Sequence, residues 1–330
     1  MIELQKDLAT AILLNRTLAM SNNCPDHTSE NIMEGGKLRI AVGIATAGRR
    51  AILNYTLDLI ARQTRPPDAL IVCPATPEDL HAELLLRFPY TTSVRLGKRG
   101  LTAQRNQILA AANASDVIVF FDDDFFPQLN YLEEIERLFL ECVDVVAITG
   151  RPIVDGANGP GLEAEAALSL ISDDRSAPGD RTVVPTYGTY GCNMAFRMAP
   201  IREKGLLFDE NLPLYGWQED IDFSRQLSGA GRIVDAKALR GVHLGAKGGR
   251  TSGVRFGYSQ IANPVYLVRK GTVSLSFAGP LLFRNVLANL ARSVRPEPWI
   301  DRRGRLKGNY LALRDLLTGR IAPQRILELG

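Results

Sequence analysis

From residue 38 the chain alternates short apolar runs with longer stretches in which apolar residues recur every three or four positions. The short runs are rich in Val and Ile and predict strands at 38–46, 69–73, 92–96, 117–121 and 144–150. The longer stretches predict helices at 49–63, 77–88, 101–113 and 128–142. Runs this apolar are typical of strands covered on both faces, and the alternation is typical of right-handed βαβ units. The pattern therefore predicts an α/β fold with a mainly parallel sheet flanked by helices.

The flanking segments follow other patterns. Gly and Pro interrupt residues 150–191, which predicts loops and a helix over the sheet edge, and a strand at 192–197 and a helix at 219–230 follow. Residues 2–20 predict an amphipathic helix, so we expect 1–36 to form an N-terminal helix and linker that pack on the protein or make a homo-oligomer contact. From 256 onward apolar faces recur at helical spacing, which predicts a helical C-terminal extension over 256–330.

Charge is small overall but unevenly distributed. The formal net charge of +3 is too small to argue for a nucleic-acid partner. Residues 281–330, however, contain ten Arg or Lys against four acidic residues. That excess favours an anionic surface or ligand near the C-terminus, although a solvated helical tail has the same composition.

The sequence also bears on location. No apolar run reaches the roughly 18 residues that a membrane span needs. The N-terminal stretch has no small-residue cleavage site, so we do not expect a signal peptide. The four cysteines are scattered without a CxxC pair, which predicts neither a zinc site nor a disulfide scaffold. We therefore expect a cytoplasmic protein that contacts the inner face of the plasma membrane.

Three consecutive carboxylates, Asp122, Asp123 and Asp124, directly follow the predicted strand at 117–121. Side chains alternate along a strand, so Asp122 and Asp124 are expected on one face and Asp123 on the other. Two hard oxygen donors suit Mg²⁺ or Mn²⁺, especially where a substrate diphosphate completes the coordination shell. The alternative is an acidic turn that caps a helix beginning near Pro127.

A second acidic group opens the predicted helix at 219–230. Glu219 and Asp220 fall in its first turn, and the aromatic residues Tyr215 and Trp217 directly precede them. Carboxylates at this position can simply complement the helix dipole. Aromatic faces beside carboxylates, however, also suit a sugar hydroxyl acceptor that must be stacked and deprotonated.

His243 begins a third candidate block, the glycine-rich segment "HLGAKGGRTSGVR". Lys247 and Arg250 within it have the composition of a mobile loop that closes on phosphates. An ordinary flexible basic loop after a structural histidine is the alternative.

In this order, the three blocks resemble the inverting nucleotide-sugar glycosyltransferases of family 2, which have the GT-A fold. The resemblance rests on "VGIATAGRR", "GLTAQRNQILAAA", "FFDDDFFP", "GCNMAFR" and "GWQEDIDFSRQL", and it covers residues 37–245. The stretch from "FFDDDFFP" to "VVAITGRPIVDGANGPG" looks most like transferases that build bacterial exopolysaccharide repeat units. The resemblance implies a GT-A domain over 37–255, with a nucleotide-binding half at 37–125 and an acceptor-binding half at 126–255.

The resemblance also implies roles for individual residues. Asp220 would be the general base, assisted by Glu219, with Tyr215 and Trp217 at the acceptor. Asp124, Asp122 and His243 would hold Mn²⁺ or Mg²⁺, and Lys247 and Arg250 would contact phosphate. The residues expected to bind the nucleotide sugar are Thr46, Arg49, Arg105, Asn106, Asp122, Asp123, Gly191 and Asn193.

Two differences from the family pattern affect the expected substrate. The acidic residue that usually ends the second strand and contacts uracil is replaced here by Cys73 and Pro74. The Q-x-x-R-W signature of processive synthases is absent, which favours addition of a single sugar. We expect a UDP-sugar donor and a glycan or polyprenyl-linked acceptor. The alternatives are a catalytically inactive glycan-binding scaffold and a sugar-phosphate nucleotidyltransferase.

Overall fold

The computed structural model describes residues 36–174, 182–248 and 252–329. The helix predicted at 2–20, its linker and Arg250 lie outside these residues. Within the described chain, no helix combines the length and the apolar character that crossing a bilayer requires.

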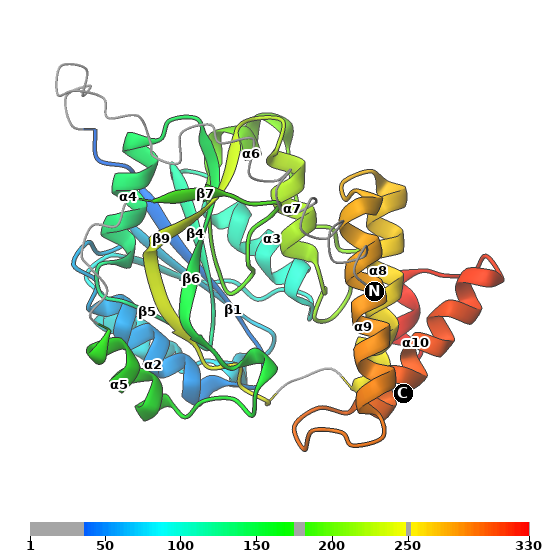
Figure 1. The fold of residues 1–330 in the computed structure, drawn as a ribbon. Coiled ribbons are helices and arrows are strands. Elements are labelled where there is room, and N and C mark those ends of the chain that lie inside the picture. The colour runs from blue at the N-terminus through cyan, green and yellow to red at the C-terminus, as the bar shows by residue number, and fades with distance from the viewer. Residues whose placement is uncertain (1–35, 175–181, 249–251, 330) are drawn as a thin grey trace.

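A nine-stranded sheet forms the centre of the molecule, in the order β3-β2-β1-β4-β8-β6-β9-β5, with β7 paired to β9 (Figure 1). The strands are β1 (Ile40–Thr46), β2 (Ala69–Pro74), β3 (Thr91–Val94), β4 (Val117–Asp122), β5 (Phe125–Pro127), β6 (Val145–Asp155), β7 (Val183–Pro185), β8 (Asn193–Arg197) and β9 (Arg232–His243). The strands β1, β2, β3, β4, β6 and β9 run in one direction, and β5, β7 and β8 run against them. The predicted α/β fold with a mainly parallel sheet is confirmed.

Alternation along the strands builds two cores, one on each face of the sheet. In β1, Ile40 and Val42 join the core that contains α2 (Arg50–Ala61) and α4 (Tyr131–Glu141), whereas Ala41 faces the opposite core. That second core is closed by α3 (Leu101–Ala111), α6 (Met198–Lys204) and α7 (Glu219–Leu227). Figure 1 shows the two sets of helices on opposite sides of the sheet, with α5 (Ala164–Asp173) beside α2. Because both faces are covered, function is confined to the strand ends.

Several elements differ from the sequence prediction. The helix predicted at 77–88 is two short 3₁₀ turns, η1 (Pro77–Asp79) and η2 (Ala82–Arg87), because Leu80 between them is extended and buried. The chain after the aspartates continues as β5 instead of a helix near Pro127, and α4 begins only at Tyr131. The strand β9 and the helix α6 were not predicted.

Three helices follow the α/β domain: α8 (Gly253–Lys270), α9 (Leu275–Arg292) and α10 (Arg302–Leu317), with the 3₁₀ turn η4 (Pro323–Leu327). The helical extension predicted from 256 thus begins at Gly253. Lys270 at the end of α8 attaches it to the α/β domain, because its Nζ donates to Asp209 and to Asp222 on α7, at 2.7 Å each. The helices α8 and α10 cross where Gly257 meets Gly308, and a Cβ on Gly308 would lie 2.1 Å from the carbonyl oxygen of Val254.

This close crossing predicts that Gly308→Ala destabilises the protein, although alanine is the better helix former. Overpacking of a close contact costs about 1–3 kcal/mol, which exceeds the gain in helix propensity of up to about 1 kcal/mol. Gly279→Ala on α9 is the matched control, since nothing lies within 4 Å of its added Cβ. Chemical denaturation should show a lower free energy of unfolding for Gly308→Ala and an unchanged or higher one for Gly279→Ala. Equal stability of the two variants would contradict the close crossing.

Candidate active site

The aspartate turn lies where β4 ends and β5 begins, and aromatic packing holds it there. Phe121 and Phe125, on either side of the three aspartates, stack with their ring centroids 5.5 Å apart. Both rings also meet the edge of Tyr131 at the start of α4. The turn is therefore anchored in the core, and its carboxylates cannot move far from the sheet edge.

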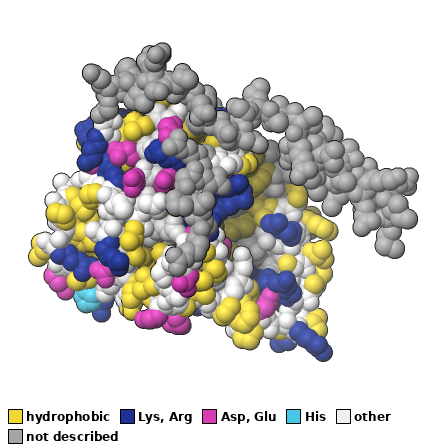
Figure 2. Space-filling view, turned by 60° about the vertical axis from the view of Figure 1, so that its left-hand side comes forward, with side chains coloured by type: hydrophobic (Ala, Val, Ile, Leu, Met, Phe, Trp, Pro, Cys, Tyr) yellow, Lys and Arg dark blue, Asp and Glu magenta, His cyan; other side chains and the backbone are white. Residues whose placement is uncertain are grey.

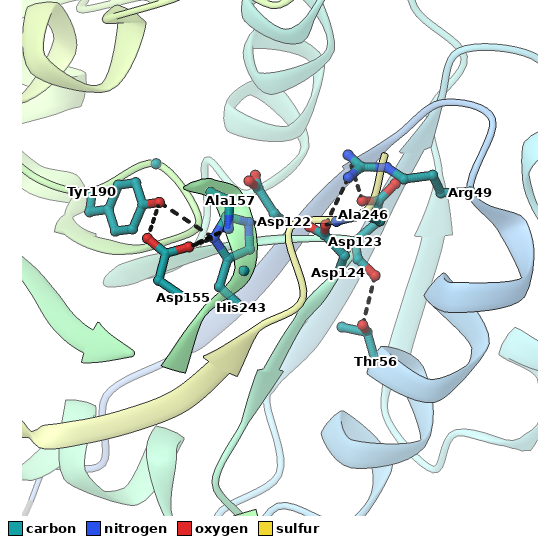
Figure 3. A network of polar contacts seen from close by, with 12 residues as sticks. Arg49, Thr56, Asp122, Asp123, Asp124, Asp155, Ala157, Tyr190, His243 and Ala246 are labelled. Carbon is teal, nitrogen blue, oxygen red and sulfur yellow. Dashed lines mark hydrogen bonds and ion pairs between the residues drawn. The ribbon is translucent and has the colours of Figure 1, made fainter. Parts of the chain in front are cut away.

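Asp124 is buried within a set of positively polarised groups (Figure 3). Its Oδ2 accepts hydrogen bonds from Arg49 at 2.9 Å and from the amide of Ala246 at 2.8 Å. Burial alone would raise the pKa of Asp124, but the neighbouring imidazole of His243 and the charge of Arg49 outweigh burial and hold this pKa below its usual range. Asp124 is therefore ionised at neutral pH.

A group of three side chains in the described chain can hold a metal ion: Asp122, Asp124 and His243, each offering one ligand atom within 4.8 Å of the others. Asp124 Oδ1 is buried without a hydrogen-bond partner, and His243 Nε2 lies 3.5 Å from it. Burial and the neighbouring charge of Asp124 raise the pKa of Asp122, although Arg105 opposes the rise. An unpartnered carboxylate oxygen beside a second carboxylate and an imidazole fits a divalent cation.

Asp123 faces away from this group and has a structural environment. Its Oδ2 accepts from the hydroxyl of Thr46 at 2.7 Å, and its Oδ1 pairs with Arg49 at 2.8 Å. Complete burial raises the pKa of Asp123 to about 7. Thr46 and Arg49, predicted at the nucleotide, are thus also the residues that hold the aspartate turn. The Thr46 side chain is buried and used by Asp123.

Glu219 and Asp220 lie together in the first turn of α7 but differ in access. Glu219 is buried and pairs with Arg105, and burial raises its pKa to about 8. Asp220 is half-buried, and its Oδ2 accepts from the amide of Gly191 at 2.8 Å. Burial also raises the pKa of Asp220, against hydrogen bonds from backbone amides. Of the two, Asp220 is the carboxylate that a substrate can reach.

Arg105 joins the two acidic groups. It pairs with Glu219 on one side, donates to Asp122 Oδ1 at 3.2 Å on the other, and donates to the carbonyl oxygen of Gly191 at 2.8 Å. Arg105 was predicted at the nucleotide. Its side chain is only 2% exposed, so it lies beneath the site. Its neighbour Asn106 was also predicted to face the nucleotide. In the structure its Nδ2 donates to the carbonyl oxygen of Phe208, and its Oδ1 accepts from the Phe208 amide.

The glycine and asparagine predicted near the donor hold neighbouring groups in place, Gly191 through its backbone and Asn193 through its side chain. Gly191 donates to Asp220 and accepts from Arg105, and a Cβ on it would lie 3.3 Å from the carboxylate oxygens of both Glu219 and Asp220. Asn193 is fully buried in β8, where its Oδ1 accepts from Thr149 at 2.9 Å. Asn193 Nδ2 is buried without a hydrogen-bond partner.

The aromatic residues before α7 lie in a segment where several residues have left-handed backbone conformations. Leu214, Gly216 and Gln218 all have positive φ, so Tyr215 and Trp217 lie between left-handed residues. Tyr215 is 54% exposed, Trp217 is half-buried, and both rings lie 6.0 Å from the ring of Phe256 on α8. Non-glycine residues with positive φ cluster at functional sites. Phe256 is an aromatic neighbour that sequence reasoning missed.

The segment after His243 borders a cavity of 380 Å³ next to the aspartate turn. It is lined by residues 48–52, 160–163 and 246–248. Lys247 was predicted to contact phosphate, and its Nζ lies 3.3 Å from the carbonyl oxygens of Gly156 and Ala157. The segment is therefore tied to the end of β6.

Comparison with known proteins gives a family. Residues 41–203 match the family model described as "Glycosyl transferase family 2". The match runs from β1 to α6 and includes the aspartate turn, Arg105 and Gly191. A search of curated proteins finds no match to the sequence.

Several solved structures share the fold. Residues 1–349 of TarS from S. aureus align over 88% of this chain and 83% of theirs, with 15% identity and a TM-score of 0.54. GalNAc-T7, solved with UDP, GalNAc and Mn²⁺, aligns over 90% of this chain and 57% of its own, with 13% identity and a TM-score of 0.53. The mannosyltransferase PcManGT from Pyrobaculum calidifontis, solved with GDP-Man and Mn²⁺, aligns over 88% and 86%, with 15% identity and a TM-score of 0.50.

The family match covers β4 and the aspartate turn, whereas Glu219, Asp220 and His243 follow it along the chain, and the likeness to the solved TarS structure extends over 88% of the chain. The chain therefore contains a glycosyl transferase family 2 domain at residues 41–203 and has the GT-A fold of these solved structures.

Proposed function

We propose that the protein transfers one sugar, with inversion, from a UDP-sugar to a glycan or polyprenyl-linked acceptor in exopolysaccharide synthesis. The observation that carries the proposal is the joining of two acidic groups by one buried arginine. Arg105 pairs with Asp122 of the candidate metal group and with Glu219, the neighbour of the accessible Asp220. One group suits a metal-bound diphosphate and the other suits an acceptor hydroxyl.

In this mechanism Asp220 is the general base. Its carboxylate removes the proton from the acceptor hydroxyl while that oxygen attacks the anomeric carbon, on the face opposite the leaving nucleoside diphosphate. The new glycosidic C–O bond forms as the C–O bond to phosphate breaks, so an α-linked donor gives a β-linked product. Hydrogen bonds from the amides of Gly191 and Ile221 fix the orientation of Asp220.

On the donor side, Asp122, Asp124 and His243 would hold Mn²⁺ or Mg²⁺. When bound, the cation would neutralise charge that develops on the leaving diphosphate. Arg49 keeps Asp123 and Asp124 in place, and Tyr215 and Trp217 offer apolar ring faces for the acceptor sugar. The UDP in the TarS and GalNAc-T7 structures supports a uridine donor, whereas PcManGT carries GDP-Man on the same fold.

Contact with the inner face of the plasma membrane is proposed from the surface of the helical extension. Beginning on α9, exposed apolar side chains recur at helical spacing at Phe283, Leu287, Leu290 and Val294. One exposed face of α10 combines basic and apolar residues: Arg303, Lys307, Tyr310, Arg314 and Leu317. The extension is at the right of Figure 2, where hydrophobic and basic side chains adjoin. Basic groups near an anionic bilayer contribute about 1 kcal/mol each.

The base assignment predicts the behaviour of Asp220→Asn. Transfer should fall by about 10²- to 10⁴-fold because the amide cannot take a proton, while binding of the nucleotide sugar with Mn²⁺ should stay at the wild-type level. Single-turnover transfer and calorimetric titration measure the two quantities. Transfer at the wild-type rate would remove Asp220 as the base.

The metal assignment predicts the opposite pattern for Asp124→Asn. Mn²⁺-dependent binding of the nucleotide should be lost, since the variant removes a charged ligand, and transfer should fall with it. Asp220→Asn is the control, because it should retain that binding. Undiminished Mn²⁺-dependent binding in Asp124→Asn would exclude the proposed metal site. Intact binding with no transfer or donor hydrolysis in the wild-type protein would favour an inactive scaffold.

The membrane proposal predicts co-sedimentation with anionic phosphatidylglycerol vesicles and none with neutral ones. The double variant Leu287→Ser, Leu290→Ser should reduce that binding at least several-fold, because it removes apolar area from the α9 face. Leu140→Ser on α4, at a similarly exposed leucine, is the control. Equal sedimentation of wild type and double variant would rule out this surface.

A further inference from the structure

His243 is held by different partners on its two ring nitrogens (Figure 3). Its Nε2 faces the aspartate turn and lies 3.5 Å from Asp124 Oδ1. Its Nδ1 faces the opposite way and lies 2.9 Å from Asp155 Oδ1. The carboxylate of Asp155 thus lies behind the ring, outside the group formed by Asp122, Asp124 and His243.

Sheet register explains why Asp155 meets His243. The strands β6 and β9 run parallel, and Asp155 at the end of β6 is the register partner of His243 at the end of β9. On its other side His243 pairs with Phe125 of β5, directly after the aspartate turn. Three adjacent strand ends therefore fix the order carboxylate, imidazole, aspartate turn.

Asp155 is itself held in place. Its Oδ2 accepts from the hydroxyl of Tyr190 at 2.8 Å, and its Oδ1 accepts from the amide of Ala157 at 2.9 Å. The ring of Tyr190 also meets the ring of His243 edge-on, with centroids 5.9 Å apart. The Tyr190 amide donates to Thr149 Oγ1 at 3.1 Å, which attaches this tyrosine to β6.

We propose that Asp155, fixed by Tyr190, is a positioning residue that keeps the proton on Nδ1 of His243 and directs Nε2 at Asp122 and Asp124. A carboxylate can only accept a hydrogen bond, so the short contact requires a proton on Nδ1. Nε2 is then the nitrogen available to a metal ion, and the ring cannot rotate away from the site. Carboxylates behind ligating histidines typically change metal affinity by about 10- to 100-fold when removed. The inference rests on the metal group of the proposed function.

The first test measures Mn²⁺ affinity of the full chain without nucleotide or acceptor, from the electron paramagnetic resonance signal of free Mn²⁺. Asp155→Ala should weaken binding by about 10- to 100-fold. Asp155→Asn should weaken it less, because the amide oxygen can still accept from Nδ1, and Tyr190→Phe should have the smallest effect. Asp235→Ala, on the same strand as His243 and paired with Arg151, is the control and should bind as the wild type does.

The second test observes the ring directly in the metal-free protein. The chain contains three histidines, so ¹⁵N-histidine labelling gives three sets of signals, and His81→Gln helps to assign them. The Nδ1 proton of His243 should exchange slowly with solvent in the wild type and in Asp235→Ala, and rapidly in Asp155→Ala. Slow exchange in Asp155→Ala would mean that this variant loses only the contact with the Ala157 amide, and it would count against the positioning role.

The outcomes separate this inference from the proposed metal site. If Asp124→Asn weakens Mn²⁺ binding but Asp155→Ala, still folded, does not, Asp155 has no positioning role. If Mn²⁺ binding is the same in wild type and Asp124→Asn, the metal site itself is wrong. If Asp155→Ala fails to fold, the same two measurements on Asp155→Asn and Tyr190→Phe test the inference. Wild-type Mn²⁺ affinity together with slow Nδ1 exchange in both variants would overturn it.

Discussion

Arg105 is buried between the rings of Phe120 and Phe208 and pairs with both acidic groups of the site. Its guanidinium is planar and presents several donors at once, so it can hold Asp122, Glu219 and the Gly191 carbonyl in one fixed arrangement. Removal of a partner from a buried ion pair typically costs about 3–5 kcal/mol, because the other charge is left uncompensated. The relative positions of the candidate metal group and of Asp220, the proposed base, therefore depend on one buried side chain.

The site nevertheless has more acidic than basic groups. Five carboxylates, at Asp122, Asp123, Asp124, Glu219 and Asp220, are compensated by three basic side chains, those of Arg49, Arg105 and His243. Burial without full compensation raises the pKa of four of the five, and Asp124 is the exception because Arg49, His243 and an amide all contact it. A divalent cation would reduce this excess of negative charge. The electrostatics of the chain thus agree with the ligand geometry.

Sequence patterns predicted features that depend on local periodicity. The alternation of side chains along β4 predicted that Asp123 faces away from Asp122 and Asp124. In the structure Asp123 accepts from Thr46, away from the other two aspartates. Helical spacing does not say which face of α3 meets the site, so it could not reveal that the Asn106 amide donates to the Phe208 carbonyl oxygen while Arg105 pairs with the acidic groups. Asp155 and Tyr190 were missed for a different reason. Their contact with His243 depends on the register between β6 and β9, which contains several irregularities that no periodicity reveals.

The helical extension helps to hold Tyr215 and Trp217, the proposed acceptor residues, in place beside α7. Left-handed backbone at Leu214 and Gln218 costs about 1–3 kcal/mol for each residue, so neighbouring contacts must stabilise it. On one side α3 does so, because the amide of Leu101 donates to the Leu214 carbonyl at 2.8 Å. On the other side α8 does so, because Asn263 donates to the Trp217 carbonyl at 2.8 Å and Phe256 lies against both aromatic rings. Lys270 of α8 also donates to Asp222 of α7. A shift of the extension would therefore move α7 together with Tyr215 and Trp217.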